Sequence, residues 1–457
     1  MTVAHQQTTR SWRSVLDGID VLDVLALAVF VFSAIAIWTK TYPFADHRIE
    51  LASGVPLSSE SRKVIMLGIA AATGFLVLLR HQFGLIRRFP DPLLFAVVAW
   101  FGLTSLFSEA RGLAFNRLAL AVIVVIIAAS LPLIFRSFQA FVGAYATAAL
   151  LAIVLSFAGI ILVPDLAIHT AMDATEQTLA GDWRGIFGHK NDMAPMMNQF
   201  LFVGLLLFRM KRPLWGGAIM IGAAVLLLKS GGKSGALTLP LTFVAAWAIV
   251  RTRSYATTVV VTLCAVGGLA AVTLGSIAFP ALGEVTQAVL PDPTFTGRTA
   301  YWSMALQAIG QAPIFGYGYT TFFDMGVLRT FAAAAGIYVL PDHAHNGFLQ
   351  LTLSAGIPGI VLALAWTTFL PLKYIQTVKL RVQTADESFF FDFLVQSWLN
   401  MLLISSLEST LFERGDPIWF GGLLAIVCLR YWHVSGGPAD ETRPASSSGA
   451  RPEVSAG

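Results

Sequence analysis

The sequence contains little charge and almost no cysteine. Charged residues make up 12% of its 457 residues, whereas soluble domains usually contain about 25%. Its two cysteines, Cys264 and Cys428, both stand in apolar runs, which argues against a disulfide framework and against a cysteine-based metal site. The net charge of +4 is small and spread along the chain, so anchoring of loops at a membrane explains it and nucleic acid is not an expected partner.

Apolar residues, by contrast, make up 56% of the chain and form long uninterrupted runs. Residues 118–135 and 138–164 contain no charged side chain, and a helix needs about 20 mostly apolar residues to cross a bilayer core. Backbone groups in lipid must bond within their own segment, so the membrane-spanning segments are expected to be helices. The sequence therefore predicts an all-α polytopic membrane protein, with membrane lipid as its surroundings.

The runs predict about twelve transmembrane helices, and an even number places both ends of the chain on one side. The expected helices cover residues 21–39, 64–79, 93–107, 117–135, 138–163, 193–209, 214–229, 234–250, 256–279, 347–370, 389–410 and 417–432. Lys and Arg in the short loops favour a cytoplasmic side for both termini. The predicted organisation is a cytoplasmic segment 1–20, a transmembrane bundle 21–434 and a disordered cytoplasmic tail 435–457.

Two longer loops, 164–192 and 280–346, are expected on the outer side of the membrane. In the second loop, apolar residues recur at helical spacing around 298–309, which predicts one or two short helices on the outer face. Long loops in compact proteins usually have a function or are disordered. Candidate site residues are therefore expected in these two loops.

The first candidate site is the segment 181–192, Gly-Asp-Trp-Arg-Gly-Ile-Phe-Gly-His-Lys-Asn-Asp. Arg binds phosphate oxygens through paired hydrogen bonds, Lys adds a point charge, and a helix N-terminus favours anions. One interpretation is that Arg184, His189, Lys190 and Asn191 bind a phosphate. The alternative is anchoring at the membrane interface, with an Asn or Asp capping the next helix.

Two further cations stand where helices are expected to begin. Lys233 lies in the turn Lys-Ser-Gly-Gly-Lys-Ser-Gly, whose spacing does not fit a nucleotide-binding loop but whose lysines and amides suit a phosphate. Arg298 opposes the dipole of the helix it opens, so it invites an anionic partner. Tyr301 and Trp302 follow it and suit either stacking on a sugar or burial at the membrane interface. The alternatives are a charged turn and a surface Arg.

The segment Asp342-His-Ala-His-Asn-Gly stands where the second loop enters a predicted helix. Histidine can act as a general base near neutral pH, so His345 is a candidate base with Asn346 or Asp342 orienting it. His343 is a candidate for substrate binding. The same residues could instead ligate a metal or cap the helix, although a zinc site needs three or four ligands. We favour the base, and we expect no metal and no cofactor.

Four more charged residues, Glu408, Glu413, Arg414 and Asp416, cluster before the last predicted helix. Ionisable residues near membrane depth are candidates for function. A turn with a local salt bridge explains this cluster slightly better, and the sequence assigns these residues no role.

His345-Asn346, followed after nine residues by Gly356-x-x-Gly359, resembles the signature of the O-antigen ligase superfamily, which includes O-antigen and exopolysaccharide repeat-unit polymerases. The stretches around Arg184 and from Gly297 to Gly318 are similar to the same family in order and separation. The resemblance covers about residues 180–360 and is closest to the exopolysaccharide polymerases. Lys233 stands where the family has an arginine, a change that loses bidentate phosphate recognition.

The resemblance implies an enzyme of the bacterial inner membrane with a periplasmic site. Such enzymes transfer a glycan from undecaprenyl diphosphate to a sugar hydroxyl with inversion and without an obligatory metal. It implies that His345 is the essential histidine and that Arg184 and Arg298 bind the diphosphate, while the other candidates contact substrate: His189, Lys190, Asn191, Lys233, Tyr301, Trp302, His343 and Asn346. The acceptor is a glycan or a lipid-linked repeat, and a chain-length regulator is a further partner that the resemblance implies.

Three alternatives stay open at this point. The first is an O-antigen ligase that uses lipid A–core as acceptor. The second is a polysaccharide transporter or flippase, although transporters place charge near the bilayer midplane and the predicted helices here are mostly free of charge. The third is a metal-dependent membrane hydrolase that uses Asp342, His343 and His345.

Overall fold

The computed structural model describes residues 20–40, 42–44, 59–171 and 177–438. Within these ranges the regular elements are helices, and β-structure is limited to one isolated bridge between Ile168 and Trp183. The predicted all-α class is confirmed. Most of the predicted segment 1–20 and of the predicted tail 435–457 lies outside the described residues.

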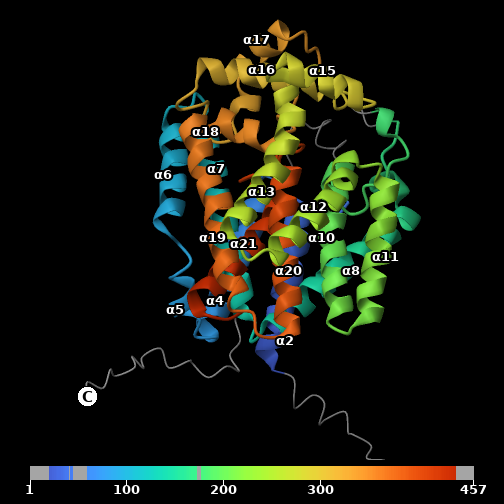
Figure 1. Ribbon diagram of the computed structural model, residues 1–457, viewed down its shortest axis with the longest axis vertical. Coiled ribbons are helices and arrows are strands. Elements are labelled where there is room, and N and C mark those ends of the chain that lie inside the picture. The colour runs from blue at the N-terminus through green and yellow to red at the C-terminus, as the bar shows by residue number, and fades with distance from the viewer. Residues whose placement is uncertain (1–19, 41, 45–58, 172–176, 439–457) are drawn as a thin grey trace, which may run out of the picture.

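Each predicted transmembrane segment coincides with a long helix of the bundle (Figure 1). These helices are α2 Val21–Trp38, α4 Ser59–Leu79, α6 Pro92–Leu106, α7 Arg111–Ser130, α8 Phe138–Leu162, α10 Lys190–Arg209, α11 Pro213–Ser230, α12 Lys233–Arg251, α13 Tyr255–Ala270, α18 Gly347–Leu364, α20 Ala385–Ile404 and α21 Pro417–Ser435. Two of them continue, α13 through η3 Ala271–Gly275 into α14 Ser276–Ala278, and α18 through η5 Ala365–Phe369 into α19 Leu370–Lys379.

By length and composition, nine helices in the described part of the chain are able to cross a membrane. Of the other three predicted spans, α6 has 15 residues, and α10 and α20 are more polar. The polarity of α10 and α20 has a structural reason, because both lie inside the bundle. Asn198 of α10 donates from Nδ2 to Gly235 O at 3.0 Å and to Asn400 Oδ1 of α20 at 3.2 Å.

Helix ends follow local sequence signals. The side chain of Asp91 accepts a hydrogen bond from Leu94 N at 2.9 Å, and Pro92 occupies the first turn of α6. Asp416 caps α21 in the same way, accepting from Trp419 N at 2.7 Å. Such caps satisfy amides that have no partner within the helix. The chain therefore enters α6 and α21 in a defined direction.

The described chain begins and ends at the same end of the bundle. Asp23, near the start of α2, pairs with Arg80 after α4, and Arg430 near the end of α21 donates to Arg88 O at 2.8 Å. Short helices cover the opposite end (Figure 1): α15 Pro280–Val289, α16 Arg298–Gln311 and α17 Val327–Ala334. The predicted short helices of the long second loop are thereby confirmed.

The glycine that follows His345-Asn346 by ten positions bends α18. Gly356 has φ +67°, which an L side chain rarely adopts, and its neighbour Ile357 donates from its amide to Pro313 O at 2.7 Å. Tyr317 N donates to Leu353 O, also at 2.7 Å. The bend therefore docks α18 onto the segment that follows α16, and it links the two motifs on which the family resemblance rests.

Candidate functional site

A buried carboxylate, Glu408, stands at the centre of a polar cluster at the covered end of the bundle. It lies in the loop 405–416 between α20 and α21. Its Oε1 accepts from Arg298 Nη2 at 2.8 Å and from Ser234 Oγ at 3.4 Å, and its Oε2 lies 3.4 Å from His345 Nδ1. One side chain thus joins the beginnings of α12 and α16 to the segment before α18.

The loop carrying His345 is fixed against the loop carrying Glu408. The side chain of Asn346 caps α18 by accepting from Phe348 N and Leu349 N, both at 3.1 Å, and donates from Nδ2 to Ser406 O at 2.8 Å. Gly347 N donates to Ser405 O at 2.7 Å. His345 itself has φ +49°, an uncommon conformation for a side chain other than Gly, Asn or Asp. Its ring position is therefore determined by both loops.

The cluster holds His345 neutral and Glu408 ionised. Burial lowers the pKa of His345, and the neighbouring His343 lowers it further, to about 4. Burial acts to raise the pKa of Glu408, but the Arg298 guanidinium and His345 outweigh it and lower that pKa to about 2. An ionised Glu408 accepts a hydrogen bond from the Nδ1–H group of neutral His345, so Nε2 of that ring keeps its lone pair. A neutral ring with a free Nε2 lone pair is the state in which histidine accepts a proton.

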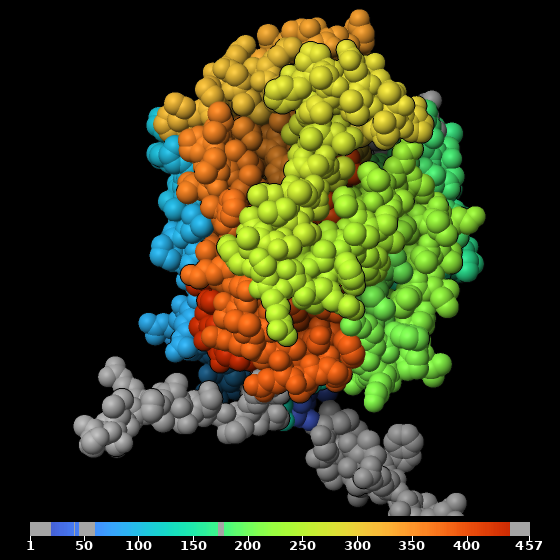
Figure 2. Space-filling view, viewed as in Figure 1, coloured from blue at the N-terminus to red at the C-terminus, as the bar shows by residue number. Residues whose placement is uncertain are grey.

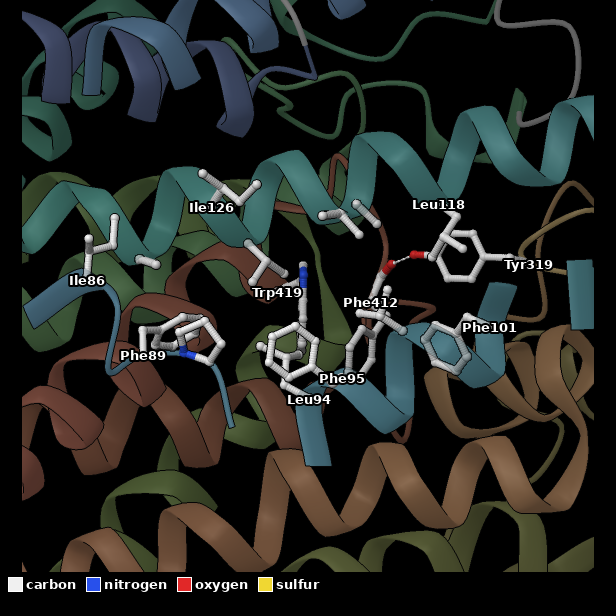
Figure 3. Close-up of a pocket in the computed structure, with 16 residues that line it drawn as sticks. Ile86, Phe89, Leu94, Phe95, Phe101, Leu118, Ile126, Tyr319, Phe412 and Trp419 are labelled. Carbon is white, nitrogen blue, oxygen red and sulfur yellow. Dashed lines mark hydrogen bonds between the residues drawn. The ribbon is translucent and has the colours of Figure 1, made fainter. Parts of the chain in front are cut away.

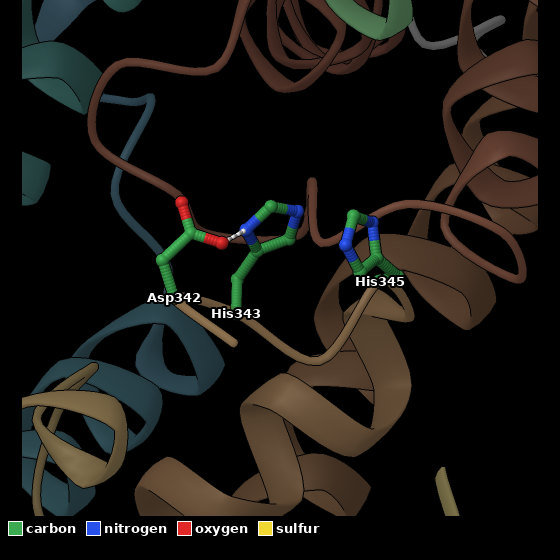
Figure 4. Close-up of side chains that lie close together, drawn as sticks. All are labelled: Asp342, His343 and His345. Atoms are coloured by element: carbon green, nitrogen blue, oxygen red, sulfur yellow. Dashed lines mark hydrogen bonds and ion pairs between the residues drawn. The ribbon is translucent and has the colours of Figure 1, made fainter. Parts of the chain in front are cut away.

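A second carboxylate–histidine pair stands beside the first. His343 Nδ1 lies 2.5 Å from Asp342 Oδ1, and the ring centroids of His343 and His345 are 4.0 Å apart (Figure 4). Burial acts to lower the pKa of His343, but the carboxylate of Asp342 more than offsets it and raises that pKa. Asp342, His343 and His345 also form the group of potential metal ligands found within the described residues, with ligand atoms within 4.8 Å of one another.

Two predicted aromatic site residues differ in their surroundings. Tyr301 stacks against His345 with ring centroids 6.1 Å apart and remains half-buried. Trp302 is fully buried and donates from Nε1 to Ala344 O at 3.0 Å, so it supports the segment that carries both histidines. Tyr301 therefore contacts His345 directly, whereas Trp302 supports the backbone between His343 and His345.

The candidate residues of the loop 164–192 form a separate group. Arg184 is buried and donates from Nε to Leu166 O at 3.0 Å, within its own loop. Lys190 Nζ pairs with Asp182 at 2.6 Å, and His189 caps α10 by accepting from Asn191 N at 3.0 Å. These bonds tie the residues to one another rather than to Glu408.

This loop packs on the turn between α11 and α12. Trp183 N donates to Lys229 O at 3.0 Å, and Lys229 Nζ lies 5.8 Å from the centre of the Trp183 ring. Lys233 follows that turn as the exposed first residue of α12, directly before Ser234, which donates to Glu408. Lys233 therefore stands between the loop 164–192 and the cluster around Glu408.

An apolar groove of about 300 Å³ lies between α6 and α7 (Figure 3). It is lined by Ile86, Phe89, Pro90, Leu94, Phe95, Val98, Phe101, Leu118, Ala121, Val122, Val125, Ile126, Ala129, Tyr319, Phe412 and Trp419. Tyr319 donates from its hydroxyl to the carbonyl of Phe412, in the loop that also carries Glu408. Arg414 in the same loop lies 3.4 Å from Thr320 Oγ1, and Arg117 of α7 donates to Thr320 O. The groove thus ends near two guanidinium groups.

A second depression is visible on another face. Figure 2 shows the surface hollowed between α13 and α12, beneath α15 and α16, with the red of the C-terminal part visible inside it. The long helix formed by residues Tyr255–Ala278 is largely exposed. Ser234 and Arg298, in the first turns of α12 and α16, both contact Glu408.

Sequence reasoning assigned no role to Glu408. It favoured a local salt bridge in that turn, and such a bridge is present between Glu413 and Arg414 at 3.0 Å. The partners of Glu408, however, come from positions 234, 298 and 345. The available signal was an acidic residue inside the predicted span 389–410, where ionisable groups are candidates for function.

Residues 216–364 match the family model described as O-Antigen ligase. The match confirms the resemblance to the O-antigen ligase and polymerase superfamily, whose members act in polysaccharide biosynthesis at membranes. It includes Lys233, Arg298 and His345, begins after Arg184 and ends before Glu408. No curated protein matches the chain.

Proposed function

We propose that this protein is an inverting glycosyltransferase that moves an oligosaccharide from undecaprenyl diphosphate to a sugar hydroxyl, without a metal, and that it polymerises exopolysaccharide or O-antigen repeat units. The observation that carries the proposal is the buried Glu408, which orients a neutral His345 and pairs with Arg298 at 2.8 Å. The match to the O-antigen ligase family supports the reaction type.

His345 is the proposed base. Its Nε2 takes the proton of the acceptor hydroxyl while that oxygen forms a bond to the anomeric carbon of the donor. The bond from the anomeric carbon to the phosphate oxygen breaks, and its electron pair leaves with the diphosphate. Glu408 then stabilises the imidazolium that forms, because its carboxylate accepts from Nδ1. Tyr301 stacks on His345 and bounds the space for the acceptor sugar.

The beginnings of α12 and α16 are proposed to bind the diphosphate. Both helices begin after glycine, Gly232 and Gly297, and neither has a side-chain cap. Uncapped amides at a helix N-terminus favour anions. Arg298 adds its remaining donors and Lys233 its ammonium group, so positive charge faces the oxygen on which negative charge grows. Arg184, buried in the neighbouring loop, is proposed to add positive charge to this region together with Lys190, and Asn191 is proposed to add a polar contact.

We propose that two openings in the helical bundle receive two lipid-linked substrates. The hollow between α12 and α13 (Figure 2) is proposed to receive the isoprenoid chain of the donor. The groove between α6 and α7 reaches Phe412 of the Glu408 loop and Tyr319, whose neighbour Thr320 contacts Arg117 and Arg414. We propose that it receives the isoprenoid chain of a lipid-linked acceptor. A lipid-linked acceptor is what a repeat-unit polymerase uses.

The proposed location is the bacterial inner membrane, with the site on the periplasmic side and both termini in the cytoplasm. The proposed organisation is a bundle over residues 21–434, with the loops 164–192 and 280–346 forming the periplasmic surface. A chain-length regulator is proposed as a partner on that surface. The short helices over this end supply an ordered platform for such a contact.

The test is an assay of purified full-length protein in lipid nanodiscs with lipid-linked repeat units and a chelator. A ladder of longer lipid-linked glycans from wild type, absent with Glu408→Ala and His345→Ala, supports the proposal. Product that forms only when lipid A–core is added makes the protein a ligase. Full activity of His345→Ala at equal protein level contradicts the proposed base. Activity that requires added zinc contradicts the metal-free mechanism.

A further inference from the structure

Two carboxylate–histidine pairs stand side by side at the site. Asp342 holds Nδ1 of His343, and Glu408 holds Nδ1 of His345. Figure 4 shows the ring nitrogen of His343 that does not contact Asp342 on the side facing His345. In the neutral form of each ring, the proton on Nδ1 faces a carboxylate and Nε2 is the acceptor. Their rings are 4.0 Å apart between centroids.

This pattern matches the chemistry by which proteins hold transition-metal ions. A metal-bound histidine usually donates its other ring nitrogen to a carboxylate, which fixes the tautomer and raises the basicity of the ligand. Imidazole nitrogen suits zinc, cobalt, nickel and copper, whereas magnesium and calcium prefer sites made of oxygen. The carboxylate of Asp342 becomes a third ligand when it turns from His343 Nδ1 toward the ion, and one ligand atom from each of the three residues lies within 4.8 Å of the others.

The site is able to tighten around an ion. Asp342 is exposed and His343 is half-buried, so both side chains can shift, while His345 is held by its own loop and by Glu408. Three protein ligands leave a coordination position for water, as is common for zinc sites that are not purely structural.

We infer that Asp342, His343 and His345 bind a divalent transition-metal ion of the zinc class, and that this ion inhibits the enzyme. The ion takes the Nε2 lone pair of His345, which is the lone pair that would accept the proton of the acceptor hydroxyl. Binding of the ion is independent of the proposed function, whereas its inhibitory effect rests on it.

The binding test uses Co²⁺ as a visible probe, because zinc has a filled d shell and no absorption of its own. Purified full-length protein in nanodiscs is titrated with Co²⁺, and the complex is then challenged with Zn²⁺. Wild type should show visible absorption of a cobalt–imidazole complex that Zn²⁺ abolishes. Asp342→Asn and His343→Gln should each weaken Co²⁺ binding by at least about tenfold. His81→Ala, at the opposite end of the bundle, is the matched control.

The inhibition test compares polymer synthesis with Zn²⁺ and with a chelator in each variant. Zn²⁺ should abolish synthesis by wild type reversibly, and His343→Gln should need at least about tenfold more Zn²⁺ for the same loss. Absence of Co²⁺ binding by wild type overturns the metal site, whatever the activity. Binding without inhibition, or activation by Zn²⁺, overturns the inhibitory role. A protein that binds Co²⁺ at these residues but makes no polymer retains the site and loses the proposed function.

Discussion

The loop 164–192 and the cluster around Glu408 differ in how far apart in the sequence their bonded residues lie. In the loop 164–192, the Arg184 guanidinium donates to Leu166 O and Asp165 O, 18 and 19 positions away, and Lys190 Nζ pairs with Asp182, 8 positions away. Around Glu408, the partners come from three distant segments, and Arg298 reaches a carboxylate 110 positions away. Local partners make a stable loop, whereas distant partners converge on a single buried charge. The comparison teaches that cations alone do not distinguish the two regions, whereas a buried carboxylate shared by distant segments does.

The largest expected effect comes from removing the base. His345→Ala should lower the transfer rate by about 10²–10⁴, because a positioned general base contributes about that much. His189→Ala is the matched histidine variant from the loop 164–192 and should cost far less. Single-turnover rates with the lipid-linked donor, at equal amounts of folded protein, measure both. Equal losses in transfer rate for His345→Ala and His189→Ala would contradict a special role for the cluster around Glu408.

The next effect concerns the buried charge. Arg298→Ala leaves Glu408 without its ion-pair partner, which typically costs about 3–5 kcal/mol in the free energy of unfolding. The double variant Arg298→Ala, Glu408→Gln should recover much of that stability but none of the activity. Arg184→Ala loses hydrogen bonds to backbone carbonyls and should be destabilised less. Thermal unfolding in nanodiscs measures all three, and a greater loss for Arg184→Ala would argue against Glu408 as the organising charge.

A smaller effect is expected in the pH dependence. The pKa of His345 is lowered to about 4, so the base is neutral above that pH, and activity should fall only as the pH drops toward 4. Because His343 contributes to this lowering, His343→Gln should move the acid limb of kcat/KM to higher pH. His81→Ala should leave the limb in place. If the acid limb of wild type lay near the ordinary histidine pKa of about 6.5, the lowered pKa of His345 as the base would be contradicted.

The smallest effect is expected in the groove between α6 and α7. Ala121→Trp fills part of the groove and should raise the KM for a lipid-linked acceptor a few-fold, with little change for a lipid-free acceptor sugar. Leu151→Trp, on the exposed side of α8, is the control of equal bulk. Equal effects of Ala121→Trp on both acceptors would show that the groove does not hold the isoprenoid chain.

Much of the fold could be predicted because its signals are local. Long apolar runs specify helices in lipid, and residues such as Asp91 and Asp416 mark where α6 and α21 begin. The two interior helices were also predicted, although Asn198 and Asn400 make them more polar than a lipid-facing helix. The covering helix over 298–311 followed from its helical spacing.

The candidate site could be predicted only in part. His345 and Arg298 stood out because histidine and arginine are unusual beside apolar runs. Each also lies in a motif that resembles the O-antigen ligase superfamily. Trp302 was expected to contact substrate, whereas the fold buries it behind Ala344. Burial and hydrogen-bond partners depend on which helices pack together, and that information is not contained in a single segment.

The sequence by itself determined the class of protein, the helical segments and the chemical groups available at one end of the bundle. These follow from the cost of placing unbonded backbone and charge in lipid, a cost that acts on each segment separately. Only the tertiary structure decided which carboxylate lies against the ring of His345. Glu408 meets Ser234, Arg298 and His345 because α12, α16, α18 and α20 converge at one point, and the low local dielectric there makes one shared charge decisive.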